Sequence, residues 1–365
     1  MSARLRILLV AGGSGGHLVP ALALADRLRS TGTSCWMLST RRPVDYLLKS
    51  ETIPWHAVDL RQLTPLWRWV SPDYLMKQAC AVGRIRAILR EIQPDAVVAF
   101  GGYLSAAAVL VARIAAIPVI LHEQNVIPGR ANRWLAFFAQ TVAVSFPQTR
   151  VHLPAKVHVR LTGNPIRVHL NGVSRAEACA HWGFDPAKPV LLVMGGSQGS
   201  RTINRLTLLM WANVSRAERE KIQVLHLAGN LGWEQVEAEY RRLSMQARVF
   251  PFLHEMEQVL NTASLAVSRA GATAIAEMAA FRMPAVLVPY PFAGAHQAAN
   301  AEWMKTAGGA VVLPEESLTP HRLWQEIRGL LEDPYRLAQM RRSLAGHADG
   351  SPADRLAQLV KEVAG

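Results

Sequence analysis

One sequence pattern occurs twice, once near the start of each half of the chain. A run of apolar residues leads into a glycine-rich turn and then a helical segment, first in LRILLVAGGSGGH at 5–17 and again in PVLLVMGGSQGS at 189–200. A short continuous apolar run is typical of a strand buried on both faces, and glycines let the backbone turn sharply after it. The repeat therefore predicts two domains of the same α/β kind.

The residues that follow each copy alternate between short apolar runs and longer helical ones. In the first half we expect strands at 5–10, 34–38, 55–60, 96–100, 119–122 and 141–145, and helices at 18–29, 74–91, 104–114 and 130–138. In the second half we expect strands at 190–194, 222–228, 249–252, 265–268, 285–288 and 311–313, helices at 202–211, 233–243, 256–261 and 273–281, and further helices within 319–363. This alternation predicts an α/β protein with two Rossmann-like domains, each a parallel sheet covered by helices.

Length and composition agree with two folded domains. The chain has 365 residues, more than one hydrophobic core usually supports, and half of its residues are hydrophobic. We place the boundary near residue 165, which gives domains at 1–165 and 166–365. The three cysteines, Cys35, Cys80 and Cys179, lack metal-ligand spacing, and the sequence has no Asp-x-Asp motif. We therefore expect a reducing cytoplasm, no metal site and no cofactor.

No segment of the sequence predicts export or a membrane span. The apolar run at the N-terminus is too short for a signal peptide and leads into glycines rather than a cleavage site. The most apolar window, 104–121, contains Arg113 and Pro118, whereas a spanning helix needs about 20 apolar residues. We expect a buried helix followed by a buried strand in that window.

The positive charge of the chain is concentrated in its first half. Residues 1–165 carry 19 Lys and Arg against 8 Asp and Glu, a net +11, whereas residues 166–365 carry 21 against 19, a net +2. Such a basic domain suits nucleic acid, an anionic membrane surface or an acidic substrate. Nucleic acid ranks last, because the chain has no recognisable nucleic-acid-binding motif, and we expect no nucleic-acid partner.

Aromatic and basic residues are interleaved after residue 64. This mixture suits an anionic membrane interface, although the tryptophans could equally pack in a core beneath a loop. The membrane-facing candidates are Trp67, Arg68, Trp69, Tyr74, Lys77 and Arg84.

Glycines and polar residues follow the predicted strands of the first half. Gly12 to Gly16 can bring backbone amides and a helix N-terminus to an anion. An acidic residue expected at the next strand end of a dinucleotide-binding domain is missing, so hydride transfer is disfavoured. His17 begins the helix, whose dipole favours a neutral imidazole that can take a proton; a helix-capping role is equally compatible with its position.

Two further polar segments follow strands of the same half. Gly101, Gly102 and Tyr103 form a second glycine turn, which suggests a polyanionic ligand, and HEQN at 122–125 leaves the next strand. Ligands bind outside the carboxyl ends of strands in such sheets, so we expect these groups to face the ligand. The alternative is that they only satisfy the backbone of their own loops.

The second half has its own set of polar groups. Ser197 lies in a phosphate-type glycine loop, and Arg167 and Arg269 are candidates for stabilising a departing pyrophosphate. Glu277 lies in an Ala-rich helix, where a buried carboxylate needs partners such as ribose hydroxyls; otherwise it faces solvent.

Taken together, the motifs resemble the MurG family of glycosyltransferases over essentially the whole chain. Their order and spacing carry the resemblance: GGSGGHLVPALALA at 12–25, GGYLS at 101–105, HEQN at 122–125, GNPIR at 163–167, GGSQGS at 195–200, SRAGATAIAE at 268–277 and HQAAN at 296–300. The resemblance implies a GT-B fold, with a deep cleft between an acceptor-binding, membrane-associating domain at 1–165 and a UDP-GlcNAc-binding domain at 166–365. It also implies that the last helices cross back to the first domain.

The resemblance assigns roles to individual residues. The catalytic base maps to His17, the ribose carboxylate to Glu277, and the sugar-contacting pair to His296 and Gln297. The full set of implied UDP-GlcNAc contacts is Ser14, Gly15, Gly16, His17, Asn125, Arg167, Ser197, Leu253, Arg269, Glu277, His296 and Gln297, with Met256 beside the uracil. The implied acceptor-side residues are Gly15, Gly16, Gly102, Tyr103, Asn125 and Asn300.

The implied activity is inverting transfer of GlcNAc from UDP-GlcNAc to the C4 hydroxyl of the N-acetylmuramoyl group of lipid I, without a metal. The implied partners are UDP-GlcNAc, lipid I, an anionic membrane surface and other cell-wall and division proteins, at the cytoplasmic face of the bacterial inner membrane. Two alternatives remain open: a UDP-GlcNAc 2-epimerase on the same scaffold, and a non-catalytic sugar-nucleotide sensor. The chain departs from many family members at 293–295, where Ala-Gly-Ala replaces a segment with an acidic residue.

Overall fold

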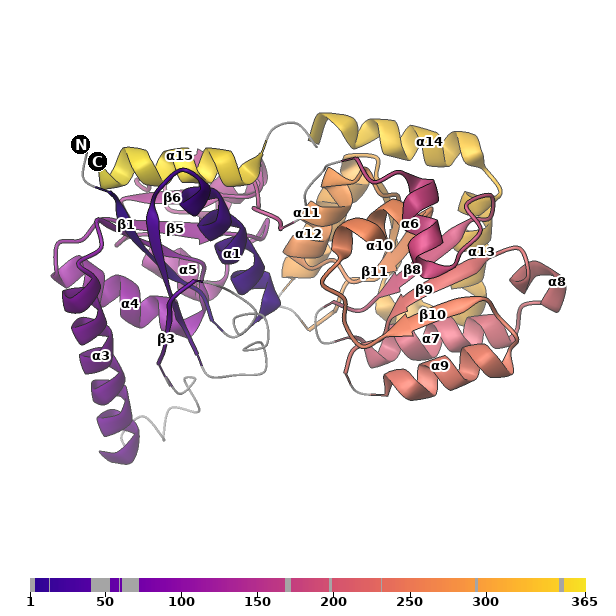
Figure 1. Ribbon diagram of the computed structural model, residues 1–365, viewed down its shortest axis with the longest axis horizontal. Coiled ribbons are helices and arrows are strands. Elements are labelled where there is room, and N and C mark those ends of the chain that lie inside the picture. The colour runs from indigo at the N-terminus through magenta and orange to yellow at the C-terminus, as the bar shows by residue number, and fades with distance from the viewer. Residues whose placement is uncertain are drawn as a thin grey trace. The chain divides into compact units, whose positions relative to one another are not determined.

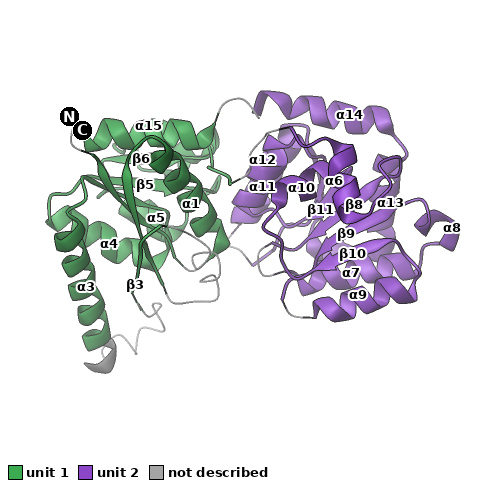
Figure 2. Cartoon of the chain, viewed as in Figure 1, with its two compact units in different colours: residues 1–167, 350–365 green, residues 168–349 purple. Residues whose placement is uncertain are grey.

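The computed structural model describes residues 4–12, 14–40, 53–58, 60, 72–167, 172–196, 199–230, 232–292, 295–347 and 351–365, without the side chains of residues 72–74. The chain divides into two compact units (Figure 2). Unit 1 contains residues 1–167 and 350–365, and unit 2 contains residues 168–349. Trp67, Arg68, Trp69 and Ser197, which the sequence singled out, lie outside the described residues.

Unit 1 is built on a parallel sheet of seven strands in the order β3-β2-β1-β4-β5-β6-β7. The strands are β1 (Arg6–Val10), β2 (Ser34–Ser39), β3 (Trp55–Ala57), β4 (Ala96–Ala99), β5 (Val119–Glu123), β6 (Thr141–Val144) and β7 (Val159–Leu161). The helices are α1 (Gly15–Ser30), α3 (Pro72–Ile92), α4 (Gly102–Ile114), α5 (Arg130–Leu135), the 3-10 helix η2 (Pro147–His152) and α15 (Pro352–Ala364). The strand order changes direction between β1 and β4, because β2 and β3 lie on one side of β1 whereas β4 to β7 lie on the other. The carboxyl ends of β1 and β4 are therefore the expected ligand position.

The sheet of unit 1 is covered on both faces because its central strands are apolar throughout. Helices α1 and α15 lie side by side on one face, and α3 and α4 pack together on the other (Figure 1). Helix α3 turns Ala81, Ile85 and Leu89 into the core that Leu8 and Val97 share. These positions recur at helical spacing, so the buried stripe of α3 follows directly from its sequence.

Unit 2 repeats the design with six parallel strands in the order β10-β9-β8-β11-β12-β13. The strands are β8 (Val190–Met194), β9 (Gln223–Leu227), β10 (Ala247–Phe250), β11 (Leu265–Ser268), β12 (Ala285–Leu287) and β13 (Ala310–Val312). The helices are α6 (Arg175–Trp182), α7 (Arg201–Ala212), α8 (Arg216–Arg219), α9 (Trp233–Arg242), α10 (Met256–Thr262), α11 (Ala272–Ala280), α12 (His296–Thr306), α13 (Pro320–Leu331) and α14 (Pro334–Ser343), with 3-10 turns η3 (Glu315–Ser317) and η4 (Ala345–His347). The strand order of this sheet changes direction between β8 and β11. The two parallel sheets confirm the predicted pair of α/β domains.

The last helix belongs to unit 1 although it ends the chain. Asp354 of α15 forms an ion pair with Arg27 of α1, and Nε of Arg355 donates a hydrogen bond to the carbonyl of Thr162 at 2.9 Å. Pro352, at the start of α15, lies beside Gly163, whose φ of +81° is a conformation that suits glycine. The C-terminal helix thus fastens the segment that follows β7.

Some elements differ from the sequence prediction. The segments at 159–161 and 175–182 form β7 and α6, although neither was predicted as a strand or helix. Strand β7 is short and partly exposed, so it lacks the apolar run that marks the other strands. Helix α6 has a capping box between Ser174 and Glu177, a local signal that predicts a helix start independently of apolar periodicity. The buried helix and strand expected in window 104–121 are confirmed as α4 and β5.

The longest helix among the described residues is α3, and the first of its side chains that are described are mostly exposed. Leu75 and Met76 are largely exposed. Within the described part of the chain, no helix combines the length and apolar character that a bilayer crossing requires.

Candidate functional site

The carboxyl ends of β1 and β4 place two glycine turns beside one histidine. His17 lies in the first turn of α1, and its Nδ1 is 3.0 Å from the carbonyl oxygen of Gly12 and 3.3 Å from Oγ of Ser14. A carbonyl oxygen can only accept, so Nδ1 carries the proton in this arrangement. The other ring nitrogen, Nε2, is then an unprotonated acceptor in the neutral ring. Among the described residues, none is hydrogen-bonded to Nε2.

The second glycine turn packs directly against this free nitrogen. A Cβ on Gly101 would lie 3.3 Å from Nε2 of His17, and a Cβ on Gly102 would lie 3.7 Å from Cε1 of the same ring. Both glycines also have positive φ, +99° and +82°, which side chains rarely adopt. The turn therefore needs glycine at both positions for its conformation, and at Gly101 also for space beside the imidazole.

The polar residues at the end of β5 hold the loop that follows it. The Glu123 carboxylate accepts from the backbone N–H groups of Asn125 at 2.9 Å and Gly129 at 3.1 Å, and from the Asn132 amide at 2.8 Å. Because these donors satisfy the buried carboxylate, Glu123 can remain in the core without a cation.

His122 is fully buried in the same region. Its Nε2 donates to the carbonyl of Gly163 at 3.1 Å, and its Nδ1 accepts from the Gln124 amide at 3.0 Å. Burial lowers the pKa of His122 to about 4, so the ring is neutral at pH 7. In this structure, the polar atoms of His122, Glu123 and Gln124 are thus engaged by neighbouring segments of unit 1.

Asn125, Tyr103 and Arg167 of unit 1 were also predicted as site residues. Asn125 donates through its side-chain amide to Glu123 at 3.1 Å. Tyr103 is partly buried, and its hydroxyl is enclosed without a hydrogen bond to any described residue. Arg167 donates from Nε to Asp26 of α1 at 3.1 Å, so its guanidinium is already paired within unit 1.

In unit 2 the glycine loop after β8 is packed against its own backbone and the neighbouring strand end. A Cβ on Gly199 would meet the carbonyl oxygen of Ala228 at 2.3 Å, and one on Gly195 would meet the amide nitrogen of Ser200 at 2.2 Å. No side chain fits at either position. Ser200 ends this loop, and its hydroxyl caps α7 by accepting a hydrogen bond from the amide of Ile203 at 3.3 Å.

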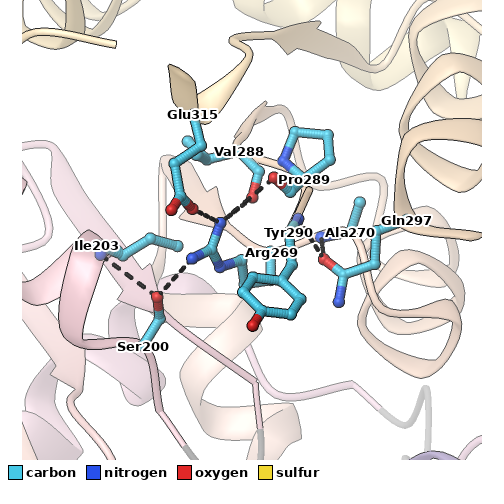
Figure 3. Close-up of polar contacts among 9 residues, drawn as sticks. All are labelled: Ser200, Ile203, Arg269, Ala270, Val288, Pro289, Tyr290, Gln297 and Glu315. Atoms are coloured by element: carbon cyan, nitrogen blue, oxygen red, sulfur yellow. Dashed lines mark hydrogen bonds and ion pairs between the residues drawn. The ribbon is translucent and has the colours of Figure 1, made fainter. Parts of the chain in front are cut away.

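Arg269, at the end of β11, is 6% exposed and connects the ends of three elements (Figure 3). Its guanidinium donates to the carbonyls of Val288 at 3.1 Å and Pro289 at 3.3 Å, and to Oγ of Ser200 at 2.9 Å. It also forms an ion pair with Glu315. In this structure the side chain therefore joins the loops of the site from within the domain.

Gln297 and Asn300 on α12 hold the same loops. Oε1 of Gln297 accepts from the backbone amides of Ala270 at 3.2 Å and Tyr290 at 3.0 Å (Figure 3). These two bonds fix the orientation of the amide and leave its NH₂ group as the part that can face a ligand. Asn300 is fully buried and donates to the carbonyl of Ala270 at 3.1 Å. His296 is the first, partly buried residue of α12.

Glu277 is partly buried in α11, and among the described residues no hydrogen bond or ion pair satisfies its carboxylate. Burial raises its pKa to about 7. A carboxylate that has lost hydration without gaining a partner in the protein is suited to binding a ligand's hydroxyl groups. Leu253 and Met256, the remaining predicted contacts, are partly buried at and before the start of α10.

Several residues near the carboxyl ends of the two sheets were not predicted from the sequence. Ser200 and Glu315 connect to Arg269, Asn132 holds Glu123, and the aromatic residues Tyr290 and Phe292 follow β12. A serine directly before a helix predicts a cap, and aromatic residues alternating with prolines after a strand mark a stiff loop, so both signals were available. The partnership of Glu315 with Arg269 had no local signal.

Comparison with known proteins agrees with this architecture. Residues 7–144 match the model of the glycosyltransferase family 28 N-terminal domain, and residues 190–356 match that of the family 28 C-terminal domain. The two sheets and their glycine loops are thus those of a two-domain glycosyltransferase.

Full-length relatives define the family more narrowly. Proteins from Nitrosococcus oceani and Methylococcus capsulatus are 37% and 35% identical to this chain, over 99% of both chains in each case. Both are named UDP-N-acetylglucosamine--N-acetylmuramyl-(pentapeptide) pyrophosphoryl-undecaprenol N-acetylglucosamine transferase. The chain belongs to this family of transferases.

Solved structures support the same assignment. The crystal structure of Acinetobacter baumannii MurG is similar with a TM-score of 0.74 and 28% identity, covering 98% of this chain and 99% of that one. A Staphylococcus aureus MnaA–UDP co-structure has a TM-score of 0.72 at 12% identity, over 98% of this chain and 96% of that one. The second likeness shows a shared fold.

Proposed function

We propose that this enzyme transfers GlcNAc from UDP-GlcNAc to the C4 hydroxyl of the N-acetylmuramoyl group of lipid I, giving lipid II. The names of its full-length relatives specify this donor and this class of acceptor. The structural observation that carries the proposal is the Nδ1–H bond of His17 to the Gly12 carbonyl at the switch point of unit 1. In the neutral ring this bond leaves Nε2 as the acceptor, and Nε2 has no hydrogen-bond partner among the described residues.

In the proposed reaction, Nε2 of His17 takes the proton of the acceptor hydroxyl. The hydroxyl oxygen forms a bond to the anomeric carbon as the bond from that carbon to the β-phosphate oxygen breaks, so configuration inverts and UDP leaves. The proton on Nε2 then returns to solvent. Because Nδ1–H remains bonded to Gly12, the resulting imidazolium keeps a hydrogen-bond partner throughout.

Residues of unit 2 bind the donor in this proposal. The N-terminus of α7 faces the departing phosphate charge, and its dipole needs no rearrangement when the charge develops. Glu277 accepts hydrogen bonds from the ribose hydroxyls, and the NH₂ group of Gln297 donates to the sugar. Arg269 and Asn300 stabilise the loops that form this surface, because their side chains are hydrogen-bonded within unit 2.

Membrane association is part of the proposal because the acceptor is a lipid. The start of α3 exposes Leu75 and Met76, and Arg84 and Arg86 are exposed further along the same helix. Exposed apolar and cationic side chains on one helix suit an anionic lipid surface such as the cytoplasmic face of the inner membrane. Other cell-wall and division proteins remain proposed partners on the family resemblance alone.

The test is an assay of UDP release with UDP-GlcNAc and a water-soluble lipid I analogue, followed by mass and linkage analysis of the product. The proposal requires UDP release that depends on the analogue and yields a β-linked GlcNAc on the C4 oxygen. Conversion of UDP-GlcNAc alone to its 2-epimer, or tight binding without turnover, would contradict the proposal and favour the epimerase or the sensor. Chelator should leave the rate unchanged.

A further inference from the structure

Two aromatic side chains stand exposed at the carboxyl end of β12. Tyr290 is 44% exposed and Phe292 is 81% exposed, and their rings meet edge to face with centroids 5.6 Å apart. A phenylalanine this exposed keeps most of its apolar surface in water, which disfavours the position unless another group covers it. The pair is therefore a candidate contact surface.

The backbone holds this pair in a stiff segment. The sequence Pro-Tyr-Pro-Phe at 289–292 has two prolines that fix φ and restrict the residue before each of them. The amide of Tyr290 donates to Oε1 of Gln297 at 3.0 Å, and the Arg269 guanidinium lies 5.3 Å from the centroid of the Tyr290 ring (Figure 3). One face of Tyr290 is thus occupied by a buried cation, while Phe292 is left for a ligand. Such preorganisation lowers the entropic cost of binding.

The surroundings indicate what kind of ligand suits the pair. A pyranose ring has an apolar face of C–H groups and a rim of hydroxyls, so it needs an aromatic face beside polar donors and acceptors. The NH₂ group of Gln297 is such a donor and belongs to the residue that holds Tyr290. The next three residues, Ala-Gly-Ala at 293–295, carry no side-chain hydrogen-bonding groups. Recognition of a sugar by this loop thus falls to its aromatic and amide groups.

We propose that Phe292, braced by Tyr290, packs against the apolar face of the GlcNAc ring of the donor and selects the sugar half of the nucleotide sugar. This inference rests on the proposed function, because it takes UDP-GlcNAc as the donor. It assigns Phe292 a role in positioning the transferred ring, while the nucleotide is held by other residues of unit 2.

The experiment compares binding of UDP-GlcNAc and of UDP by calorimetry in the full-length protein. Phe292→Ala should weaken UDP-GlcNAc binding about threefold to tenfold, the range for one lost aromatic contact, and leave UDP binding unchanged. Phe292→Tyr should restore the affinity. Phe292→Leu keeps an apolar side chain without the ring face and should remain weakened.

The matched control is Tyr335→Ala on α14, which removes another exposed aromatic ring paired with an arginine, Arg342, at 5.8 Å. It should change neither affinity. Unchanged UDP-GlcNAc binding in Phe292→Ala, an equal loss for UDP, or full rescue by leucine would each overturn the inference. Failure of the wild-type enzyme to transfer GlcNAc would instead overturn the proposed function, so the two failures are distinguishable.

Discussion

The two units have the same sheet design, yet they use their polar side chains in opposite ways. In unit 1, His122 and Glu123 are buried and hydrogen-bonded, while Nε2 of His17 has no hydrogen-bond partner among the described residues. In unit 2, the predicted polar contacts Arg269 and Asn300 hold the loops together from within. In the proposed mechanism, unit 1 therefore offers one acceptor nitrogen for the reaction, whereas unit 2 offers a rigid surface for the donor, which includes the Gln297 NH₂ group and two aromatic rings.

The largest expected effect tests the reactive atom of unit 1. His17→Ala should lower kcat about 10²- to 10⁴-fold, the usual contribution of a general base, with the KM for UDP-GlcNAc changed far less. Steady-state kinetics with the lipid I analogue give both parameters. His321→Ala on α13, which removes an exposed histidine, is the control. A His17→Ala rate within about tenfold of wild type would remove the base assignment.

The next effect tests whether Arg269 supports unit 2 from within. Arg269→Ala should lower the free energy of unfolding by about 3–5 kcal/mol, because it leaves Glu315 without its partner in a largely buried position. Urea unfolding measures this loss. Arg216→Ala breaks an exposed pair with Glu220 and should cost less than about 1 kcal/mol. If Arg269→Ala were as stable as wild type but failed to bind UDP, Arg269 would be a ligand contact rather than a support.

Glu277 is the exception in unit 2, since its carboxylate has no partner among the described residues. Its pKa is raised from 4.5 to about 7, so the folded state binds the extra proton and wild-type stability falls as pH rises through that window. Glu277→Gln should equal wild type at pH 4.5 and be more stable by about 1–3 kcal/mol at pH 8. Urea unfolding at both pH values measures this gain.

The same variant should bind UDP more weakly, because it replaces the charged acceptor that the ribose hydroxyls would use. Glu302→Gln, at an exposed pair with Lys305, is the control for both measurements. Greater stability together with weaker binding would separate a functional carboxylate from a structural one. Unchanged UDP affinity would remove the ribose assignment.

The smallest effect concerns the neighbour of His17. Oγ of Ser14 lies 3.3 Å from Nδ1, farther than the Gly12 carbonyl at 3.0 Å, so it is the weaker of the two partners. Ser14→Ala should lower kcat about two- to fivefold, as expected for one weak hydrogen bond. Ser30→Ala at the other end of α1 should leave kcat unchanged. A loss as large as that of His17→Ala would mean that Ser14 itself takes part in the chemistry.

Local sequence predicted most of the fold, because buried parallel strands are short apolar runs and glycines mark their carboxyl ends. Strands β8 and β11 begin and end where their apolar runs do. Strand β7 and helix α6 were not predicted, since neither has a strong apolar period. The return of α15 to unit 1 came only from the family resemblance, because an amphipathic helix does not reveal which sheet its apolar face will cover.

By itself, the sequence determined the strand ends where polar residues gather, among them His17, Glu277 and Gln297. The tertiary structure decided what each polar group does there. Arg269 is occupied by Ser200 and Glu315, which lie 69 and 46 positions away along the chain, and Oε1 of Gln297 is occupied by two backbone amides. A hydrogen bond depends on the position and direction of both partners in space, and only the folded chain brings such distant groups within hydrogen-bonding distance.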